Sequence, residues 1–265
     1  MEENTKKIEI SDQVRLPIGI DIDGTRYRNV VIDELTGVDD HLVSDKKNGN
    51  NSAKASSKVL CRVIQEIEGL VTRKKNPSSL IERDVVQKMY GPDRDYIMAR
   101  VYMLSGRDEI MLAGECPRCE RVWEEKALLS DMEVIEWDDS HDLDLPFSLP
   151  KGIFDEKTSS YQKDGFLKVP TGKIQELSGD LQGADAVDAL LCSCITKLGS
   201  FLSLDRNRVM NMVSRDRDVL LEMIQHDFPG LHPWKEVKCQ CGRDFLVRAD
   251  MTAFFGGRRK KEKNF

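Results

Sequence analysis

The sequence has no long apolar run and no excess of positive charge. Its 265 residues carry 40 Lys and Arg against 46 Asp and Glu, which gives a formal net charge of −6. A nucleic-acid-binding surface needs positive charge, so nucleic acid is not the expected partner. No apolar run reaches the roughly 18 residues of a membrane-spanning helix, and the first residues, "MEENTKKIEISDQ", lack the apolar stretch of a secretory signal. We expect a globular cytoplasmic protein without a membrane partner.

The sequence also lacks the common motifs of enzymes. It contains no GxSxG, GxGxxG, Walker or HExxH pattern. The acidic stretches "DIDG" and "DDSHDLD" do not have the ligand spacing of a calcium-binding loop. The four histidines form no metal-binding pair: they are His41, His141, His226 and His232. We therefore predict a protein that is not an enzyme and has no small-molecule substrate.

Cysteine, in contrast, is well represented. An odd number of cysteines, seven, in a protein expected in the reducing cytoplasm indicates thiols or metal ligands rather than disulfides. Cys61, Cys192 and Cys194 lie in apolar stretches with helical spacing, so we expect them to be buried as small apolar side chains. The other four, which lie in short polar turns, are the candidate ligands.

The sequence contains a weak internal repeat. "IERDVVQKMYGPDRDYIMAR" (81–100) and "LDRNRVMNMVSRDRDVLLEM" (204–223) align without a gap, with six identities in twenty positions, including Asp-Arg-Asp in both. Further on, Cys116 matches Cys239, and Cys119 matches Cys241 after a one-residue deletion. Upstream, "RLPIGIDIDG" (15–24) resembles "SLPKGIFDEK" (148–157). The matches keep the same order along the chain, which predicts two tandem copies of one unit.

The repeat defines the expected domains. Copy one covers residues 14–138 and copy two covers residues 146–255, joined by the acidic stretch "EWDDSHDLDLP". The polar stretch 44–58 reads as a loop inserted in copy one, and residues 1–13 and 256–265 as flexible tails.

Each copy is predicted to have an α+β fold. Short strands come first, then a helix within 58–70 or 185–200, a short helix near 81–90, and a helix that ends near 104. Asp93 or Asp95, and Asp216 or Asp218 in copy two, are placed to cap that last helix, with the intervening Arg in a salt bridge. A strand–turn–strand hairpin with the cysteines ends each copy.

The two cysteine turns predict one shared metal site. A Cys-x-x-Cys turn presents two thiolates, and a tetrahedral Zn²⁺ needs four. Hairpins related by a pseudo-twofold axis would together supply Cys116, Cys119, Cys239 and Cys241 to a closed, structural zinc site. Two alternatives stay open. The shorter Cys-x-Cys turn can have lost its metal, or the cysteines can be redox-active, although a redox Cys-x-x-Cys usually begins a helix and here strands flank it.

The motifs of both copies resemble those of the phage tail baseplate family named after the baseplate hub subunit of phage T4. The resemblance rests on Leu198-Gly199, Asp216-Arg217-Asp218 and the turn from Cys239 to Phe245, and on Asp93-Arg94-Asp95 and the turn from Cys116 to Trp123. It implies a structural component or assembly factor of a phage tail baseplate, located in the virion and, during assembly, in the host cytoplasm. Its implied partners are other tail proteins.

A second hypothesis assigns the turns to a zinc-ribbon adaptor that binds nucleic acid or a transcription complex. Its support is the cysteine turns together with the basic stretch "GGRRKKEKNF" (256–265).

Overall fold

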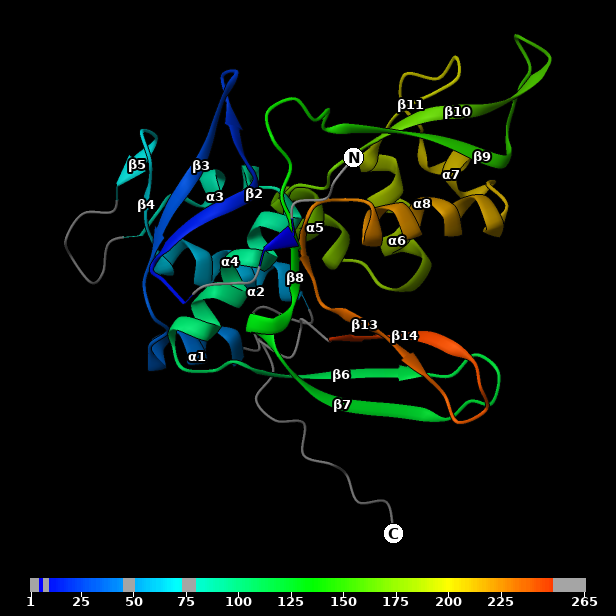
Figure 1. The fold of residues 1–265 in the computed structure, drawn as a ribbon. Coiled ribbons are helices and arrows are strands. Elements are labelled where there is room, and N and C mark those ends of the chain that lie inside the picture. Colours follow the sequence, from blue (N-terminus) through cyan, green and yellow to red (C-terminus); the bar gives the residue numbers. More distant parts are fainter. Residues whose placement is uncertain (1–4, 7–9, 45–50, 73–79, 250–265) are drawn as a thin grey trace.

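The protein has an α+β fold, as predicted. The computed structural model describes residues 5–6, 10–44, 51–72 and 80–249, and Figure 1 shows their arrangement. The expected basic tail, 256–265, lies outside these residues. In the part of the chain that the structure describes, no helix is both long enough and apolar enough to cross a membrane.

The first half of the chain forms a four-stranded antiparallel sheet, in the order β2-β3-β4-β5, with helices beside it. Helix α4 packs on strand β2. The elements of this half, in chain order, are β1 (Thr5–Lys6), β2 (Gln13–Ile22), β3 (Thr25–Ile32), α1 (Gly37–Ser44), α2 (Ser52–Val63), β4 (Ile64–Ile67), β5 (Val71–Thr72), α3 (Arg83–Lys88), α4 (Gly91–Leu104), β6 (Glu109–Glu115), β7 (Val122–Leu128), the 3₁₀ turn η2 (Leu129–Asp131) and β8 (Glu133–Ile135).

The second half forms a three-stranded antiparallel sheet in the order β11-β10-β9, and helix α8 packs on β9. Its elements, in chain order, are β9 (Asp144–Asp155), β10 (Ser160–Lys168), α5 (Gly172–Gly179), α6 (Gly183–Cys194), β11 (Ile195–Leu198), α7 (Arg206–Met210), α8 (Ser214–His226), β12 (Gly230–His232), β13 (Trp234–Lys238) and β14 (Asp244–Ala249). Strand β12 returns to the first half and pairs with β8, which also pairs with β1.

The boundaries of two helices differ from the sequence prediction. The predicted helix in 58–70 starts earlier, at Ser52, because the side chain of Asn51 accepts the N–H of Lys54 and caps it. Residues 52–58 are therefore helical rather than part of an inserted loop. The same helix ends at Val63, and β4 follows because it pairs with β3. In the second half α6 likewise ends at Cys194 and passes directly into β11, which pairs with β10.

A bulge of the same form interrupts the first hairpin of each half. Residues 16–19, "LPIG", lie opposite Arg28 alone, between the pairs Arg15↔Asn29 and Ile20↔Tyr27. Residues 149–152, "LPKG", lie opposite Lys163 alone in the same way. Gly19 and Gly152 have φ angles of 97° and 79°, a region that favours glycine. The bulges turn main-chain N–H groups out of the strand ladder.

The first Asp of each Asp-Arg-Asp motif binds these N–H groups. Asp93 on α4 accepts from Ile18 N (2.8 Å) and Gly19 N (2.9 Å). Asp216 on α8 accepts from Lys151 N (2.9 Å) and Gly152 N (2.8 Å). The predicted capping role is wrong, since the N-cap positions are Tyr90 and Val213 and neither helix has a side-chain cap. Both carboxylates lie inside the first turn and fix the helix to the bulged strand.

The Arg of each motif binds the short helix that precedes it. Arg94 Nη1 donates to Val86 O (3.2 Å), and Arg217 Nη1 donates to Val209 O (3.5 Å). Arg217 also forms the predicted kind of salt bridge, with buried Asp188 at 2.7 Å. Arg94 instead donates from Nη2 to the Ser57 hydroxyl at 2.8 Å.

The hydrophobic core consists of two clusters. The first cluster joins β2, β3, α2, β4, α4 and β6, and the second joins β9, β10, α6, β11, α7 and α8. Strands β13 and β14 belong to the second half, yet their buried residues Val237, Phe245 and Val247 lie in the first cluster. In return, Ile18 of β2 lies in the second cluster. Each half therefore buries some of its apolar side chains in the core of the other half.

Polar contacts also join the halves. Two main-chain hydrogen bonds join the halves: Gly91 N donates to Pro170 O (2.7 Å), and Gly172 N donates to Met89 O (2.8 Å). Nearby, the buried carboxylate of Glu176 on α5 accepts from Arg83 (2.6 Å) and Gln87 (2.7 Å), and also from the Ser57 hydroxyl.

Candidate metal centre

The cysteine hairpins lie side by side in one sheet. The sheet has the strand order β13-β14-β6-β7, and β14 pairs with β6 through Arg248↔Ala113 and Ala249↔Leu112. All neighbouring strands are antiparallel, so β6 and β13 run in the same direction and both cysteine turns lie at the same end. Figure 1 shows both turns at the right-hand end of this sheet.

This strand order differs from the predicted pseudo-twofold arrangement. A twofold axis that relates two hairpins side by side in one sheet would place like strands next to each other, either β6 beside β13 or β7 beside β14. In the observed order unlike strands, β14 and β6, are neighbours. The side-by-side arrangement of the hairpins is what brings their turns together.

The main chain of the two turns closes in a similar way. Cys116 N donates to Arg121 O (3.0 Å), and Cys239 N donates to Arg243 O (2.8 Å). The residue after the second cysteine has a positive φ in each turn: 56° at Glu120 and 82° at Gly242. The one-residue difference between Cys-x-x-Cys and Cys-x-Cys is thus absorbed inside the turn, and both turns end in the left-handed region.

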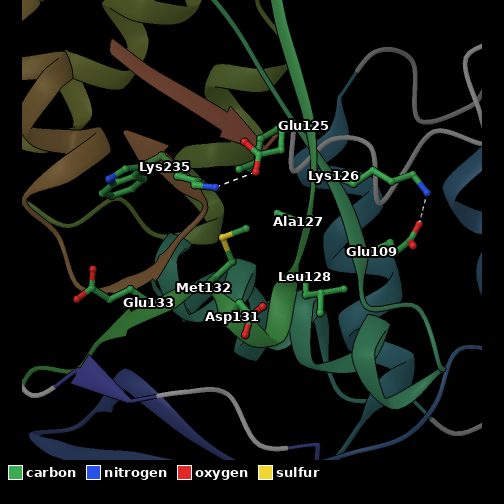
Figure 2. A pocket seen from close by; sticks show the side chains of 11 residues that line it. Glu109, Glu125, Lys126, Ala127, Leu128, Asp131, Met132, Glu133 and Lys235 are labelled. Carbon is green, nitrogen blue, oxygen red and sulfur yellow. Dashed lines mark hydrogen bonds and ion pairs between the residues drawn. The ribbon is translucent and has the colours of Figure 1, made fainter. Parts of the chain in front are cut away.

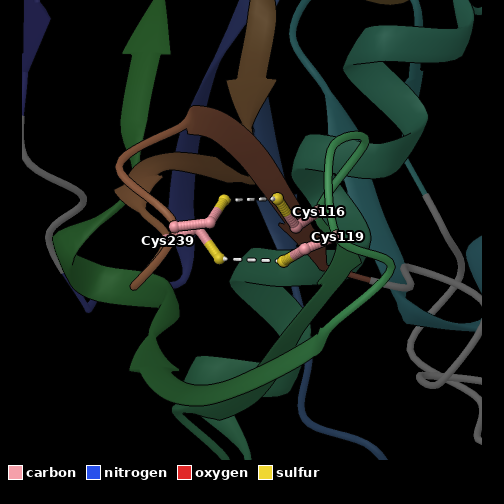
Figure 3. A group of neighbouring side chains, drawn as sticks. Cys116, Cys119 and Cys239 are labelled. Atoms are coloured by element: carbon pink, nitrogen blue, oxygen red, sulfur yellow. Dashed lines mark hydrogen bonds between the residues drawn. The ribbon is translucent and has the colours of Figure 1, made fainter.

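The four sulfur atoms converge. Cys116 Sγ lies 3.6 Å from Cys241 Sγ, and Cys119 Sγ lies 3.6 Å from Cys239 Sγ. All four sulfur atoms lie within 4.8 Å of one another. Figure 3 shows the sulfur atoms of Cys116 and Cys119 facing the two sulfur atoms of the other hairpin. The distances exceed the S–S bond of about 2.05 Å, so these are thiols and not disulfides.

The donor set and its geometry fit a tetrahedral metal ion. Four sulfur atoms around an ion with metal–sulfur bonds of about 2.3 Å lie about 3.8 Å apart, close to the observed 3.6 Å. Cysteine sulfur is a soft ligand, and a tetrahedral set of four favours zinc or iron over magnesium or calcium. The four cysteines can therefore hold a metal ion, and they leave no protein-free position for a substrate.

The cluster itself prepares one thiolate. Burial raises the pKa of Cys116, but the N–H groups of Arg118 and Cys119 and hydrogen bonds with Cys239 and Cys241 lower it to about 6. The N–H of Arg121 lowers the pKa of Cys119, yet its hydrogen bonds with neighbouring cysteines and its burial raise it to about 12. The pKa of Cys116 is thus lowered and that of Cys119 raised, mainly by the hydrogen bonds within the cluster. A bound cation would favour the thiolate form of all four cysteines.

Two ion pairs and a groove lie on the sheet that carries the cysteine turns. Lys235 Nζ on β13 lies 2.8 Å from Glu125 Oε1 on β7, and Lys126 Nζ lies 2.7 Å from Glu109 Oε2. Both pairs border a groove of about 440 Å³ that Leu112 and Met132 also line. Figure 2 shows the two ion pairs and Met132 in this groove. Since β13 and β7 are the outer strands of the sheet, the Lys235–Glu125 pair links the two hairpins by their outer strands.

The other three cysteines are not part of the cluster. Cys61 and Cys194 are buried, as predicted, and Cys192 is half-buried. Burial raises the pKa of Cys61 to about 11 and that of Cys194 to about 12, so both stay protonated and unreactive. The sequence thus separated the two classes of cysteine correctly. It missed the function of Asp93 and Asp216, which a search for carboxylates paired with a glycine bulge could have found.

Comparison of the chain with models of protein families, with curated proteins and with solved structures gives no match in any of the three.

Proposed function

We propose that this protein is a structural, non-enzymatic protein whose two halves are tandem copies of one unit, clamped by a shared Zn²⁺. The observation that carries this proposal is the convergence of four sulfur atoms from two hairpins that lie more than a hundred residues apart in the sequence. Cys116 and Cys119 come from the first copy, and Cys239 and Cys241 from the second. The four cysteines would surround the ion completely, as in structural rather than catalytic zinc sites.

The bulged hairpins support the duplication. In both halves a Leu-Pro-x-Gly bulge faces one basic residue, and a buried Asp on the fourth helix binds the two N–H groups of the bulge. Cys61 and Cys192 are both the tenth residue of a twelve-residue helix. Such agreement in order, register and hydrogen bonding is expected of two copies of one unit.

The site residues have distinct parts in the proposed clamp. When bound, zinc supplies a divalent charge that holds four thiolates together. Cys116, with its lowered pKa, offers the first thiolate, and the N–H groups of Arg118, Cys119 and Arg121 stabilise negative charge on sulfur. Arg118 Nη1 donates to Cys241 O at 3.3 Å, which holds the second turn against the first. The ordering of β13–β14 on the first core would follow from these contacts.

As a biological role we propose a component or assembly factor of a bacteriophage tail baseplate, acting through contacts with other tail proteins. The support is the resemblance of the Leu-Gly, Asp-Arg-Asp and cysteine-turn motifs to that family, and a site without an open metal position. Related but unequal surfaces on the two copies suit a protein that joins different neighbours. The virion, and the host cytoplasm during assembly, are the corresponding locations.

The zinc proposal is tested by metal analysis of purified full-length protein. We expect one zinc ion per chain, and a lower metal content and melting temperature for Cys119→Ser and Cys241→Ser. Cys192→Ser is the matched control, because this half-buried thiol lies outside the cluster and should leave the metal content unchanged. Protein that is free of metal after growth in zinc, and equally stable with a chelator, would contradict the clamp.

The baseplate role is tested in the phage context. We expect the protein to co-purify with assembled tails or with tail assembly intermediates, and a Cys119→Ser variant to reduce the yield of complete tails. Absence of the protein from both fractions would reject this role while leaving the zinc site untouched.

A further inference from the structure

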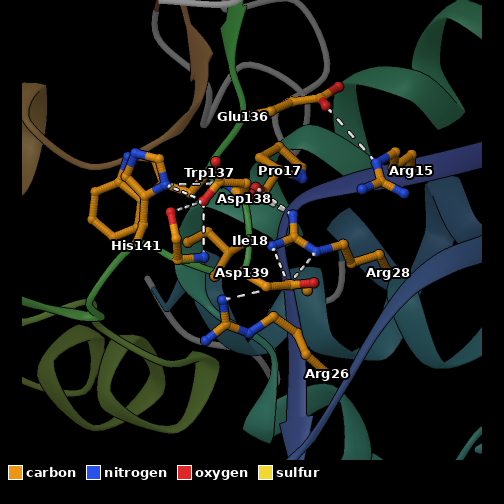
Figure 4. Close-up of polar contacts among 12 residues, drawn as sticks. Arg15, Pro17, Ile18, Arg26, Arg28, Glu136, Trp137, Asp138, Asp139 and His141 are labelled. Carbon is orange, nitrogen blue, oxygen red and sulfur yellow. Dashed lines mark hydrogen bonds and ion pairs between the residues drawn. The ribbon is translucent and has the colours of Figure 1, made fainter. Parts of the chain in front are cut away.

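An acidic segment of the chain is bound to the first bulged hairpin. Residues 136–139 run along β2, where Trp137 N donates to Pro17 O at 2.9 Å. Arg28 donates to Trp137 O (2.5 Å) and pairs with Asp139 (2.9 Å). Arg26 and Arg15 lie 3.9 Å from Asp139 and Glu136, respectively. Figure 4 shows this extended acidic segment held by three arginines.

The second hairpin presents the corresponding surface. A Cβ atom built on Gly19 would lie 2.8 Å from Arg28 Cγ, and one built on Gly152 would lie 2.9 Å from Lys163 Cγ. Lys163 therefore covers its glycine bulge as Arg28 does. Pro150 has the position of Pro17, and β9, like β2, is an edge strand of its sheet. Main-chain groups at an edge can bind an added extended segment.

In the second half this surface is exposed. Ile18 in the first bulge is buried in the second core, but Lys151, at the same place in the second bulge, is exposed. The second cross-strand pair after the bulge is Asp21↔Arg26 in the first hairpin and Phe154↔Tyr161 in the second. Phe154 and Tyr161 are 49% and 51% exposed, with their rings in edge-to-face contact at 5.3 Å. Two neighbouring exposed aromatic side chains indicate a binding surface, because a partner that covers them removes apolar area from water.

A hollow of about 750 Å³ lies beside this aromatic pair. Lys151 and Lys157 are among its lining residues, together with Phe154 and Tyr161. Arg208, Asp155 and Glu156 also line it. Glu156 is exposed, whereas the Asp155 carboxylate is buried and accepts from Ser200 Oγ (2.6 Å) and Lys157 N (2.9 Å). The second hairpin face, defined as Lys151, Phe154, Lys157, Tyr161 and Lys163, thus offers positive charge around an aromatic centre. Figure 1 shows the β9–β10 hairpin reaching beyond the helices of its half.

We propose that the second hairpin face binds an extended, acidic segment of another protein that carries an aromatic side chain. The segment would lie along β9 as residues 136–139 lie along β2, with its carboxylates on the lysines and its aromatic ring on Phe154 and Tyr161. Residues 136–139 are themselves seated on the first hairpin, so a partner protein must supply the segment. This inference rests on the proposed protein–protein role, and it is independent of the zinc site.

The probe is a labelled peptide with the sequence EWDDSHDLDLP, residues 136–146 of this chain, added to full-length protein. We expect saturable binding in fluorescence anisotropy that weakens with added salt. Phe154→Ser with Tyr161→Ser, which removes both aromatic rings without adding charge, should weaken binding about tenfold or more, and Lys163→Glu should weaken it as well. Phe166→Asp is the control, because exposed Phe166 lies on the same strand but outside the hollow.

Two further peptides separate charge from the aromatic anchor: one with Asn and Gln in place of the acids, and one with Ala in place of Trp. Both should bind more weakly. No binding to the wild-type protein, or binding that the Phe154→Ser/Tyr161→Ser variant leaves unchanged, would overturn the proposal. Self-association that depends on these residues would also overturn it, by assigning the face to a second copy of this chain. Zinc content, measured on the same samples, reports separately on the proposed clamp.

Discussion

The Asp93 carboxylate binds the main-chain N–H of Gly19 at 2.9 Å, across 74 residues of sequence. In the second half Asp216 binds Gly152 N at 2.8 Å. A bulge leaves N–H groups without a strand partner, and burying them unpaired would be costly. One carboxylate on the helix that packs on the strand satisfies two of them. Each Asp therefore decides how its helix sits on its hairpin.

Asp93→Asn and Asp216→Asn should each lower the free energy of unfolding by about 1–3 kcal/mol, because an amide oxygen can accept for only part of the pair of N–H groups. Urea denaturation measures the change. Asp218→Asn is the matched control, since this carboxylate is exposed, and should change stability by less than about 0.5 kcal/mol. Equal effects at all three positions would contradict this role.

Asp93 should also make stability depend on pH. Burial raises its pKa from 3.8 to about 7, although the N–H groups of Ile18 and Gly19 and the nearby Arg28 lower it. The folded protein then keeps a proton that the unfolded chain releases near pH 4. The contribution of this group is complete below pH 4 and is lost as the pH rises toward 7. Unfolding measured from pH 4 to 8 should show this slope, and Asp93→Asn should reduce it, leaving the smaller part from Asp95, whose pKa burial raises to about 6.

Glu176→Gln should weaken the junction between the halves. Burial raises the pKa of Glu176, but hydrogen bonds from Ser57, Arg83 and Gln87 lower it by a larger amount. The net pKa is therefore below the usual 4.5. Its contribution is therefore present above about pH 5 and is lost as the pH falls through the folded pKa. We expect a loss of about 1–3 kcal/mol at pH 7. The difference from wild type should shrink on acidification; a constant difference would exclude an ionic contribution.

Gly172→Ala should destabilise the protein through Arg94. A Cβ at Gly172, the first residue of α5, would lie 1.8 Å from Arg94 Nη1, and Arg94 is buried and bound to Val86 O and Ser57. Overpacking of this kind costs about 1–3 kcal/mol. Gly37, the first residue of α1, has no atom within 4 Å of its Cβ position, so Gly37→Ala should be neutral or slightly stabilising. Thermal unfolding of both variants tests the contrast.

Gly242→Ala and Glu120→Gly, each at the left-handed residue of a cysteine turn, should have opposite effects on stability. Glu120 and Gly242 both follow the second cysteine of a turn and have positive φ. Gly242→Ala should cost about 1–2 kcal/mol from the left-handed conformation, whereas Glu120→Gly should be neutral or stabilising. The Gly242 variant should also bind zinc more weakly in competition with a chelator. If Gly242→Ala has no effect on either stability or affinity, the turn does not depend on its left-handed residue.

The sequence predicted the α+β class, the strand–turn–strand form of both cysteine segments and the burial of Cys61 and Cys194. These properties are local: they depend on apolar spacing, turn residues and redox chemistry. Helix boundaries were less accurate, because the end of α2 at Val63 depends on β4 pairing with β3, which lies far away in the sequence. The pseudo-twofold expectation failed for a related reason, since strand order within a sheet depends on which edges meet.

The sequence by itself determined which residues could act: four cysteines in polar turns, two Asp-Arg-Asp motifs and two Leu-Pro-x-Gly stretches. Only the tertiary structure decided what they act on. It placed β14 beside β6, which brings the sulfur atoms of both turns together at one end of the sheet. It also covered the first hairpin with residues 136–139 and left Phe154 and Tyr161 exposed on the second. Contacts between distant segments fix these relationships, and no local pattern encodes them.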